Sequence, residues 1–554
     1  HPINVAGKVT STGTSVFASL DISGDIDVDG TTNLDNTDID GTLNASGLTY
    51  LNSGNNSGVA LKIGGESGNG LKTQYIFAAN QYNWQFGAAT HASNTFSFTP
   101  STASEGTTFS NPVLNLHIDG ISTPTLGTSN VRLGVNAGNS IASGGNYNVV
   151  VGDEAGTNLT TGDSNTLIGY LAGEDIVGGG NNVAIGYETM KNEDGHGKNT
   201  AVGTQALFAQ NAGADAYNTA VGFQAGASTT TGIYNTFIGG LAGDALTDAD
   251  NNVAVGRAAL STDTLGSCSV AIGRNALVTQ NFTSATDSFN VAVGDRAGAA
   301  VTTGTNNTLI GGLSGDAITT GAQNTAVGQG ALSANTTASS NTAVGYQALY
   351  DNTTGTQTVA VGTSALANNT TANNNVAVGM QTAFSTTTGG NNIAMGKQAL
   401  YYNTTGTSNV AIGHVAMHLN TTADNNTSVG YQSLYANTTG AQNTAVGRNA
   451  LDANTTASEN TAIGNSAMGN NTTGAENTAV GSASLFANTT GANNVAIGRD
   501  ALKANTTASN NTAVGYQAGT AVTTGTLNTL IGSLAGDAIT TGNSNVAVGY
   551  QTLS

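Results

Sequence analysis

From residue 126 onward, the same pattern of apolar and polar positions recurs along this chain with a 17-residue period. Each repeat holds a short apolar cluster that ends in a glycine, and 25 such marker glycines run from Gly134 to Gly549. Of the 24 intervals between them, 21 match this period and the others are slightly longer. Because so short a repeat cannot bury a core alone, each repeat must stack on its neighbours. The pattern predicts an all-β parallel β-roll or solenoid of about 25 coils over residues 126–554. The repeat is most regular over Gly345, Gly362, Gly379, Gly396, Gly413, Gly430, Gly447, Gly464, Gly481, Gly498 and Gly515.

The first apolar piece of each repeat has the two-residue alternation of a strand. In the unit that spans residues 341–355, Thr342 and Val344 share one face and Ala343 lies on the other. We expect Thr342 and Val344 to face the core of the coil. An alanine on the opposite face suits close packing against another chain.

A second apolar piece and a turn complete the repeat. Ala348 and Leu349 are expected to form a second short strand on the opposite wall of the coil. The marker glycine is expected where φ is positive or where two backbones approach closely. Asparagine suits the closing turn, and stacked copies form a hydrogen-bonded ladder. These turn asparagines are Asn335, Asn352, Asn369, Asn403, Asn420, Asn437, Asn454, Asn471, Asn488 and Asn505. Each begins an Asn-Thr-Thr triplet, a formal N-glycosylation acceptor, although turn chemistry accounts for the spacing without sugar.

Residues 1–50 alternate aspartate with apolar residues, most clearly over residues 25–30. This run resembles the opening of an EF-hand calcium loop, but the twelfth position, where that loop needs glutamate, is Asn36. We therefore expect a thin β-structured shaft with aspartate on its wet face. Calcium bound between symmetry-related chains is the alternative.

Residues 51–125 hold most of the bulky aromatic residues. Tyr82, Trp84 and Phe86 alternate, as do Phe96 and Phe98. This spacing predicts the strands of a small antiparallel β domain with one packed face. Core packing is the expected role of Trp84, with a carbohydrate-stacking platform as the alternative.

Composition favours a fibre that works outside the cell. Only 8% of the residues are charged, and 76 of the 554 are glycine, which is unlike a cytosolic enzyme. A formal net charge of −20 with 13 scattered basic residues disfavours nucleic acid and anionic lipid as partners. No apolar run is long enough to span a bilayer, so membrane insertion is not expected. Cys268 is the single cysteine, which excludes an intrachain disulfide.

No catalytic constellation is apparent, and we expect neither an enzyme nor a bound cofactor. Carboxylates are sparse in the long run of coils, whereas polysaccharide cleavage needs a close pair. His117, His414 and His418 lie in strand-like or coil settings without the spacing of metal ligands.

The candidate receptor contacts come from polar and lengthened coils. Glu193, Asp194 and His196 lie in the most polar segment, expected to be a solvated loop or a receptor contact, with a metal site as the alternative. Insertions must bulge outward from a solenoid, so residues 208–217 and 278–289 are further candidates. They contribute Asn211 and Phe282.

The repeat resembles a known family. The run NTAVGYQAL, residues 341–349, and the variant NVAIG at 494–498 are similar to the head repeat of trimeric autotransporter adhesins, the YadA-like parallel β-roll. The 17-residue period is a few residues longer than is typical of that family. Together with DIDVDGTTNLDNTDIDG at residues 25–41 and the aromatic β domain, the long array resembles phage tail-fibre proteins. This resemblance implies a homotrimer, often completed by a C-terminal chaperone that cleaves itself off, and the end of the chain in mid-coil at Ser554 hints at such cleavage.

These observations predict a virion tail fibre that attaches to a host-surface glycan or outer-membrane protein. Its other partners would be copies of itself and other virion tail proteins. A trimeric adhesin on a bacterial surface is the nearest alternative. Two further alternatives are an ice-binding solenoid with threonine ladders at Thr353 and Thr354, and a polysaccharide depolymerase.

Overall fold

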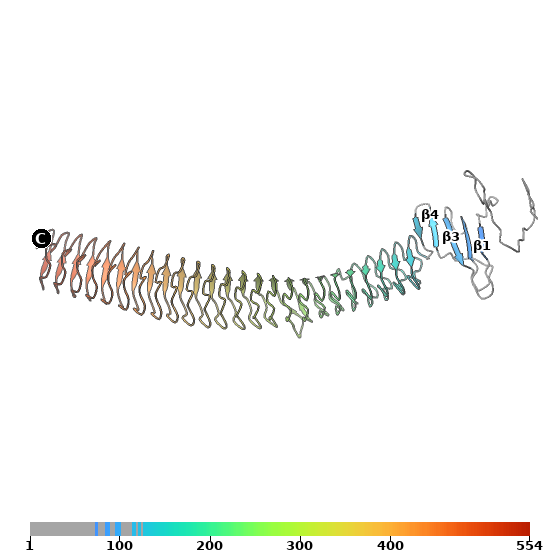
Figure 1. Ribbon diagram of the computed structural model, residues 1–554, viewed down its shortest axis with the longest axis horizontal. Coiled ribbons are helices and arrows are strands. Elements are labelled where there is room, and N and C mark those ends of the chain that lie inside the picture. Colours follow the sequence, from blue (N-terminus) through green and yellow to red (C-terminus); the bar gives the residue numbers. More distant parts are fainter. Residues whose placement is uncertain (1–71, 76–83, 89–94, 101–113, 118–119, 123–125) are drawn as a thin grey trace, which may run out of the picture. The chain divides into compact units, whose positions relative to one another are not determined.

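The computed structural model describes residues 72–75, 84–88, 95–100, 114–117, 120–122 and 126–554 (Figure 1). The expected shaft over residues 1–50, with its aspartate run and the calcium alternative, lies outside the described residues. The described residues contain strands and turns and no helix, so the chain is all-β there.

The first five strands form one antiparallel sheet in the order β1-β2-β3-β4-β5. They are β1 (Lys72–Tyr75), β2 (Trp84–Ala88), β3 (Thr95–Pro100), β4 (Leu114–His117) and β5 (Gly120–Ser122). Phe86 is opposite Phe98 across β2 and β3, and Trp84 is opposite Pro100. The antiparallel strands predicted from the alternating aromatic residues are therefore present.

The remainder of the chain is a parallel β-solenoid with one three-residue strand in each of 25 coils. The strands of this coil stack are β6 (Val131–Leu133), β7 (Val149–Val151), β8 (Thr166–Ile168), β9 (Val183–Ile185), β10 (Thr200–Val202), β11 (Thr219–Val221), β12 (Thr236–Ile238), β13 (Val253–Val255), β15 (Val270–Ile272), β17 (Val291–Val293), β18 (Thr308–Ile310), β19 (Thr325–Val327), β20 (Thr342–Val344), β21 (Val359–Val361), β22 (Val376–Val378), β23 (Ile393–Met395), β24 (Val410–Ile412), β25 (Thr427–Val429), β26 (Thr444–Val446), β27 (Thr461–Ile463), β28 (Thr478–Val480), β29 (Val495–Ile497), β30 (Thr512–Val514), β31 (Thr529–Ile531) and β32 (Val546–Val548). Each strand pairs in parallel with the next, and equivalent residues lie opposite each other, as Ala343 and Ala360 do. The 17-residue period is therefore the register of the sheet.

The two faces of each strand are the reverse of the prediction. Ala343 is fully buried, whereas Thr342 and Val344 are only half-buried. The same holds along the stack, because the middle residue is buried in every strand except β6, where it is Arg132. Alternation places the first and third residues on one side but does not say which side is inward. In most coils the interior is so narrow that only a small middle residue fits.

The opposite wall of the coil is a turn and not a second strand. Ala348 and Leu349 are fully buried and do face the core, as expected. However, Leu349 has a φ of 51°, in the left-handed region, so the predicted second strand does not form. We call the position of Leu349 in each coil the wall position. Most of the regular coils thus fill their core with a strand alanine, a wall leucine or methionine, and the alanine before it.

In four coils the middle residue of the strand is large and the neighbouring wall positions are glycine, which is the reverse of the regular coil. Phe237 fills the middle of β12 with no exposed surface, and the wall positions of its own and the preceding coil are Gly243 and Gly226. A Cβ at either glycine would lie 2.5 or 2.6 Å from the Phe237 ring. Leu167, Leu309 and Leu530 are each flanked by wall glycines in the same way. The core volume is therefore conserved across coils although the residues are not.

The marker glycines form a ladder. Both expected reasons for glycine, a positive φ and a close approach of two backbones, hold there. Gly345 has a φ of 135°, and a Cβ there would lie 2.6 Å from the carbonyl carbon of Gly362 in the next coil. Equivalent contacts recur along the stack. Backbone must therefore touch backbone at this corner, which any side chain would prevent.

Two ladders of buried asparagine hold the turns. In the turn ladder, Asn369 Nδ2 donates to Asn352 Oδ1 at 2.7 Å, and Asn352 Nδ2 donates to the carbonyl of Gly355 at 2.9 Å. The second ladder, which the sequence analysis did not identify, uses the asparagine that precedes most strands. There the backbone N–H of Asn165 donates to Asn148 Oδ1 at 2.9 Å, and Asn148 Nδ2 donates to Gly162 O at 2.9 Å. All ten asparagines of the Asn-Thr-Thr triplets are fully buried, so their amides cannot carry sugar in the folded coil.

Asn471 and its neighbour Asn470 offer a matched test of the turn ladder. Asn471 Nδ2 donates to Asn454 Oδ1 and Gly474 O, and its Oδ1 accepts from Asn488 Nδ2 at 2.7 Å. Replacing it with alanine leaves buried partners unpaired, so Asn471→Ala is expected to destabilise its coil by about 2–3 kcal/mol. Asn470 is exposed, and Asn470→Ala is expected to change stability by less than about 0.5 kcal/mol. Hydrogen exchange of the amides in residues 454–491 measures both changes, and equal effects would contradict the ladder's role.

Candidate functional site

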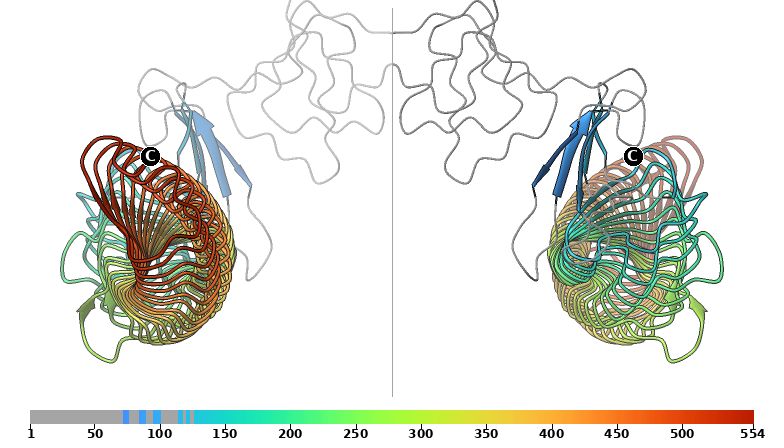
Figure 2. Two further views of the ribbon diagram at one scale, coloured as in Figure 1. Left: turned by 90° about the vertical axis from the view of Figure 1, so that its left-hand side faces the viewer. Right: turned by 90° about the vertical axis from the view of Figure 1, so that its right-hand side faces the viewer.

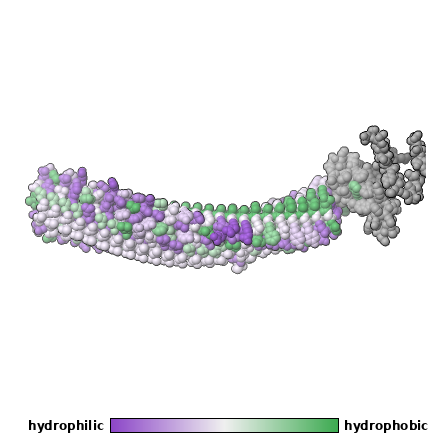
Figure 3. All heavy atoms as spheres, in the orientation of Figure 1, coloured by the Kyte–Doolittle hydropathy of each residue, from purple (hydrophilic) through white to green (hydrophobic). Residues whose placement is uncertain are grey.

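An apolar outer face runs along the coil stack. It consists of the first and third residues of β6–β13, β15 and β17–β32, and we call it the outer stripe. The first residue of every strand is Val, Ile or Thr, and the third is Val or Ile in all but two strands, which have Leu133 and Met395. Ile238 is 41% exposed and Ile463 is 40% exposed. Figure 3 shows an apolar line of this kind along the upper edge of the part of the stack that lies nearer the N-terminal strands.

The outer stripe is too large for the surface of an ordinary monomer. Apolar patches on soluble monomers rarely exceed about 600 Å², and a band two residues wide over 25 coils is several times larger. Parallel sheets are almost always covered on both faces. In the solenoid the inner face is covered by the wall of the coil, and the outer face has no cover within the described residues.

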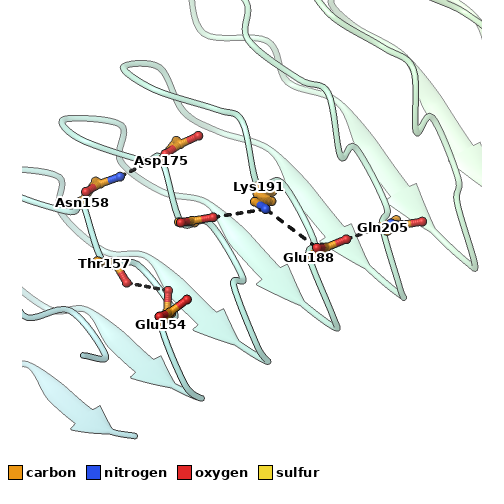
Figure 4. Close-up of polar contacts among 8 residues, drawn as sticks. Glu154, Thr157, Asn158, Asp175, Glu188, Lys191 and Gln205 are labelled. Atoms are coloured by element: carbon orange, nitrogen blue, oxygen red, sulfur yellow. Dashed lines mark hydrogen bonds and ion pairs between the residues drawn. The ribbon is translucent and has the colours of Figure 1, made fainter. Parts of the chain in front are cut away.

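A chain of charged and amide side chains crosses three coils near β9 (Figure 4). Lys191 Nζ lies 3.5 Å from a Glu174 oxygen and 3.8 Å from a Glu188 oxygen. Gln205 Nε2 donates to Glu188 at 2.8 Å. The Lys191–Glu174 and Gln205–Glu188 contacts join successive coils, so they brace the coils against one another at the surface. Surface ion pairs contribute little stability individually.

The predicted contact residues Glu193, Asp194 and His196 lie together just after this chain. One oxygen of each carboxylate and one ring nitrogen of His196 all lie within 4.8 Å of one another. Asp194 is exposed, His196 is half-buried and Glu193 is fully buried. Burial raises the pKa of Glu193 to about 7; the His196 N–H bond opposes the rise, and Asp194 and Asp215 add to it. Glu193 therefore cannot present its side chain to a receptor, whereas Asp194 can.

The lengthened coils place Asn211 and Phe282 differently. Asn211 is exposed, as a receptor contact requires. Phe282 is only 5% exposed and packs against Gly266, so that prediction of a receptor contact was wrong. An aromatic ring in an insertion is buried where it can anchor the loop to the coil below. The exposed residues of this insertion are Thr279, residues 283–285, Asp287 and Phe289, which is 55% exposed.

A buried polar network anchors the longer insertion. Asp263 Oδ1 accepts from the N–H groups of Gly266 and Phe282 at 3.1 Å, and Asp263 Oδ2 accepts from Gln280 Nε2 at 2.7 Å. The short strands β14 (Gly266–Ser267) and β16 (Thr286–Asp287) then pair in parallel. The pair stands out from the outline of the coils (Figure 2). This protrusion is thus held by specific bonds.

A stack of aromatic rings on consecutive coils was missed in the sequence. Phe384, Tyr401, His418 and Tyr435 follow one another at 17-residue spacing, with ring centroids 5.2–5.3 Å apart. Tyr402 meets Tyr401 edge-on and is 46% exposed. Aligning the repeats would have revealed the column. His414 and His418 each stack on a tyrosine of the next coil, Tyr431 and Tyr435.

The single cysteine, Cys268, lies beside an acidic side chain. The Cys268 sulfur lies 3.8 Å from Asp287 Oδ1, and burial together with that carboxylate raises the pKa of the thiol. Among the described residues, no helix has the length and apolar character needed to cross a membrane.

Comparison with known proteins identifies no relative. No family model matches this chain, and neither the curated proteins nor the solved structures include a match.

Proposed function

We propose that this chain is the protomer of a homotrimeric attachment fibre whose three solenoids associate through their outer stripes. The observation that carries the proposal is the unbroken line of half-buried and exposed residues along the coil stack, nearly all of them Val, Ile or Thr. Equivalent residues lie in register on every coil, so a second copy aligned in parallel meets the same chemistry along its whole length. The seam predicted at the alanine face is excluded because Ala343 and its equivalents are inside the coil.

The fibre would act by holding several copies of a binding site at a distance from the body that carries it. Stacked at roughly 4.8 Å per coil, 25 coils extend about 120 Å, which holds a binding site away from the body that carries it. Three copies of a weak site then bind with avidity. We propose the virion tail as that body and a host-surface glycan or outer-membrane protein as the target. The exposed aromatic and insertion residues are the candidate contacts. A bacterial surface adhesin would use the same geometry and remains the alternative.

One observation speaks against ice binding. Thr353 Oγ1 donates to the carbonyl of Thr370 at 3.0 Å, and the equivalent threonines do the same along the stack. These hydroxyls serve the coil stack, so that row does not offer the free donors of a water-ordering face.

Native mass, measured by light scattering on a sizing column, tests the assembly. A mass near three times 54.8 kDa is expected for the intact chain. Val327, Val344 and Val361 occupy the outer stripe on three consecutive coils, and replacing all three with lysine would bury unpaired charge at the seam. The assembly of this variant is expected to dissociate at least tenfold more readily.

The matched control replaces Thr337, Thr354 and Thr371 with lysine. These exposed turn residues belong to the same three coils and are expected to leave the mass unchanged. A monomeric intact chain, or equal effects of the two triple variants, would contradict the outer stripe as the seam. Binding of the assembled chain to bacterial cells, but not to cells stripped of surface glycan and protein, would then support attachment.

A further inference from the structure

We propose that residues 193–196 bind one divalent transition-metal cation of the Zn²⁺ class through Glu193, Asp194 and His196. The turn position, held by Asn352 in the regular unit, carries a carboxylate in only two coils of the solenoid. These are Glu193 and Asp263, both fully buried. Elsewhere an amide, a threonine or an apolar residue fills the position.

The two buried carboxylates differ in their hydrogen bonds. Asp263 accepts three bonds, from Gly266, Phe282 and Gln280. Glu193 accepts one, from the N–H of His196 to Oε1 at 3.2 Å. Its Oε2 is buried and has no partner. A buried carboxylate oxygen without a hydrogen-bond donor is energetically costly. Glu193 Oε2 therefore lacks a partner that would offset the cost of its burial.

A second buried atom without a partner lies in the same cluster. His196 Nδ1 has no hydrogen bond, and a His196 ring nitrogen lies within 4.8 Å of oxygens from Glu193 and Asp194. One cation satisfies both atoms together, because carboxylate oxygen and imidazole nitrogen are ligands of Zn²⁺. Three protein ligands leave a fourth position of the tetrahedron for water.

The loop has the freedom that closure around an ion needs. Ligand atoms around Zn²⁺ lie about 3.4 Å apart in a tetrahedral site, so Asp194 and His196 must move closer to the fixed Glu193. Between them is Gly195, where an added Cβ would meet nothing within 4 Å. Asp215 of the next coil is already engaged, by Lys198 Nζ at 2.7 Å and by the Gly197 N–H. It therefore does not complete the ligand set.

Calorimetric titration of the full, untagged chain tests the site. After removal of metal with a chelator, the protein is titrated with ZnCl₂, and one ion per chain is expected. Co²⁺ in place of Zn²⁺ is expected to give the visible absorption of a tetrahedral site. Glu193→Gln and His196→Ala should each weaken binding by about a hundredfold, since each removes a direct ligand.

The variants are chosen so that a loss of folding is not mistaken for a loss of metal binding. Gln210 and Gln280 occupy the turn position in other coils, so Glu193→Gln is compatible with the coil, and hydrogen exchange of residues 183–202 checks this. His414→Ala is the matched control, because His414 is exposed and stacks on Tyr431 far along the chain. Absence of Zn²⁺ binding overturns the proposal. Binding that survives both ligand variants, or that is lost equally in His414→Ala, shows adventitious metal and also overturns it.

Discussion

Phe237→Ala is expected to destabilise the coils around β12 by about 4 kcal/mol, the usual cost of emptying a buried aromatic site. The ring occupies the space that two wall leucines fill in regular coils, with Gly226 on one side and Gly243 on the other. Each repeat contacts only its neighbours, so the loss is local. Hydrogen exchange of residues 219–255 should report it while distant coils remain protected.

A compensating variant distinguishes volume exchange from a general intolerance of substitution. Adding Gly226→Leu and Gly243→Leu to Phe237→Ala restores the strand alanine and the wall leucines of regular coils and is expected to recover at least half of the lost stability. Gly243→Leu alone should destabilise, because its Cβ would lie 2.5 Å from the Phe237 ring. If the triple variant is no more stable than Phe237→Ala, the two kinds of coil are not interchangeable packings.

Gly345→Ala is expected to interrupt the stack, with a loss of more than about 3 kcal/mol. The new Cβ would meet the Gly362 carbonyl at 2.6 Å, and φ is 135°, a region that alanine rarely adopts. Neither problem can be relieved by rotating a side chain. The two coils must separate at that corner, and exchange protection should fall in residues 342–362.

The control for this variant is Gly213→Ala, in the insertion of 208–217. An added Cβ there meets nothing within 4 Å, so a change below about 0.5 kcal/mol is expected. Comparable losses at Gly345 and Gly213 would mean that the glycine ladder is not set by backbone contact.

The sequence was sufficient for the period, the parallel register and the glycine corner, because each depends on backbone geometry that recurs in every coil. It was not sufficient to orient the strand. Thr342, Ala343 and Val344 alternate in the same way whichever side is inward, and hydrophobicity alone favoured valine as the core residue. The available interior width decided the matter, and that width depends on where Leu349 sits across the coil.

For the candidate site, too, the sequence predicted some features and not others. Polarity and insertion length selected candidate segments, but could not tell which of their residues are buried and which are exposed. Phe282 turned inward because its N–H group and ring found partners in the coil below. Glu193 stands out only once its unpaired oxygen is known, and the column from Phe384 to Tyr435 only once the coils are aligned in space. Hydrogen bonds between residues one repeat apart are not visible in a linear reading.

A solenoid in which each coil bonds only to its two neighbours responds to axial tension one coil at a time. Force applied along the axis passes through every coil interface in series, so the weakest interface opens first and the others stay closed. Each coil that peels away releases one repeat of slack, about 55 Å once its place in the stack is subtracted. The lengthened coils release more. A load that arrives suddenly at one end is therefore absorbed in discrete, nearly equal extensions, and the rod lengthens before it breaks.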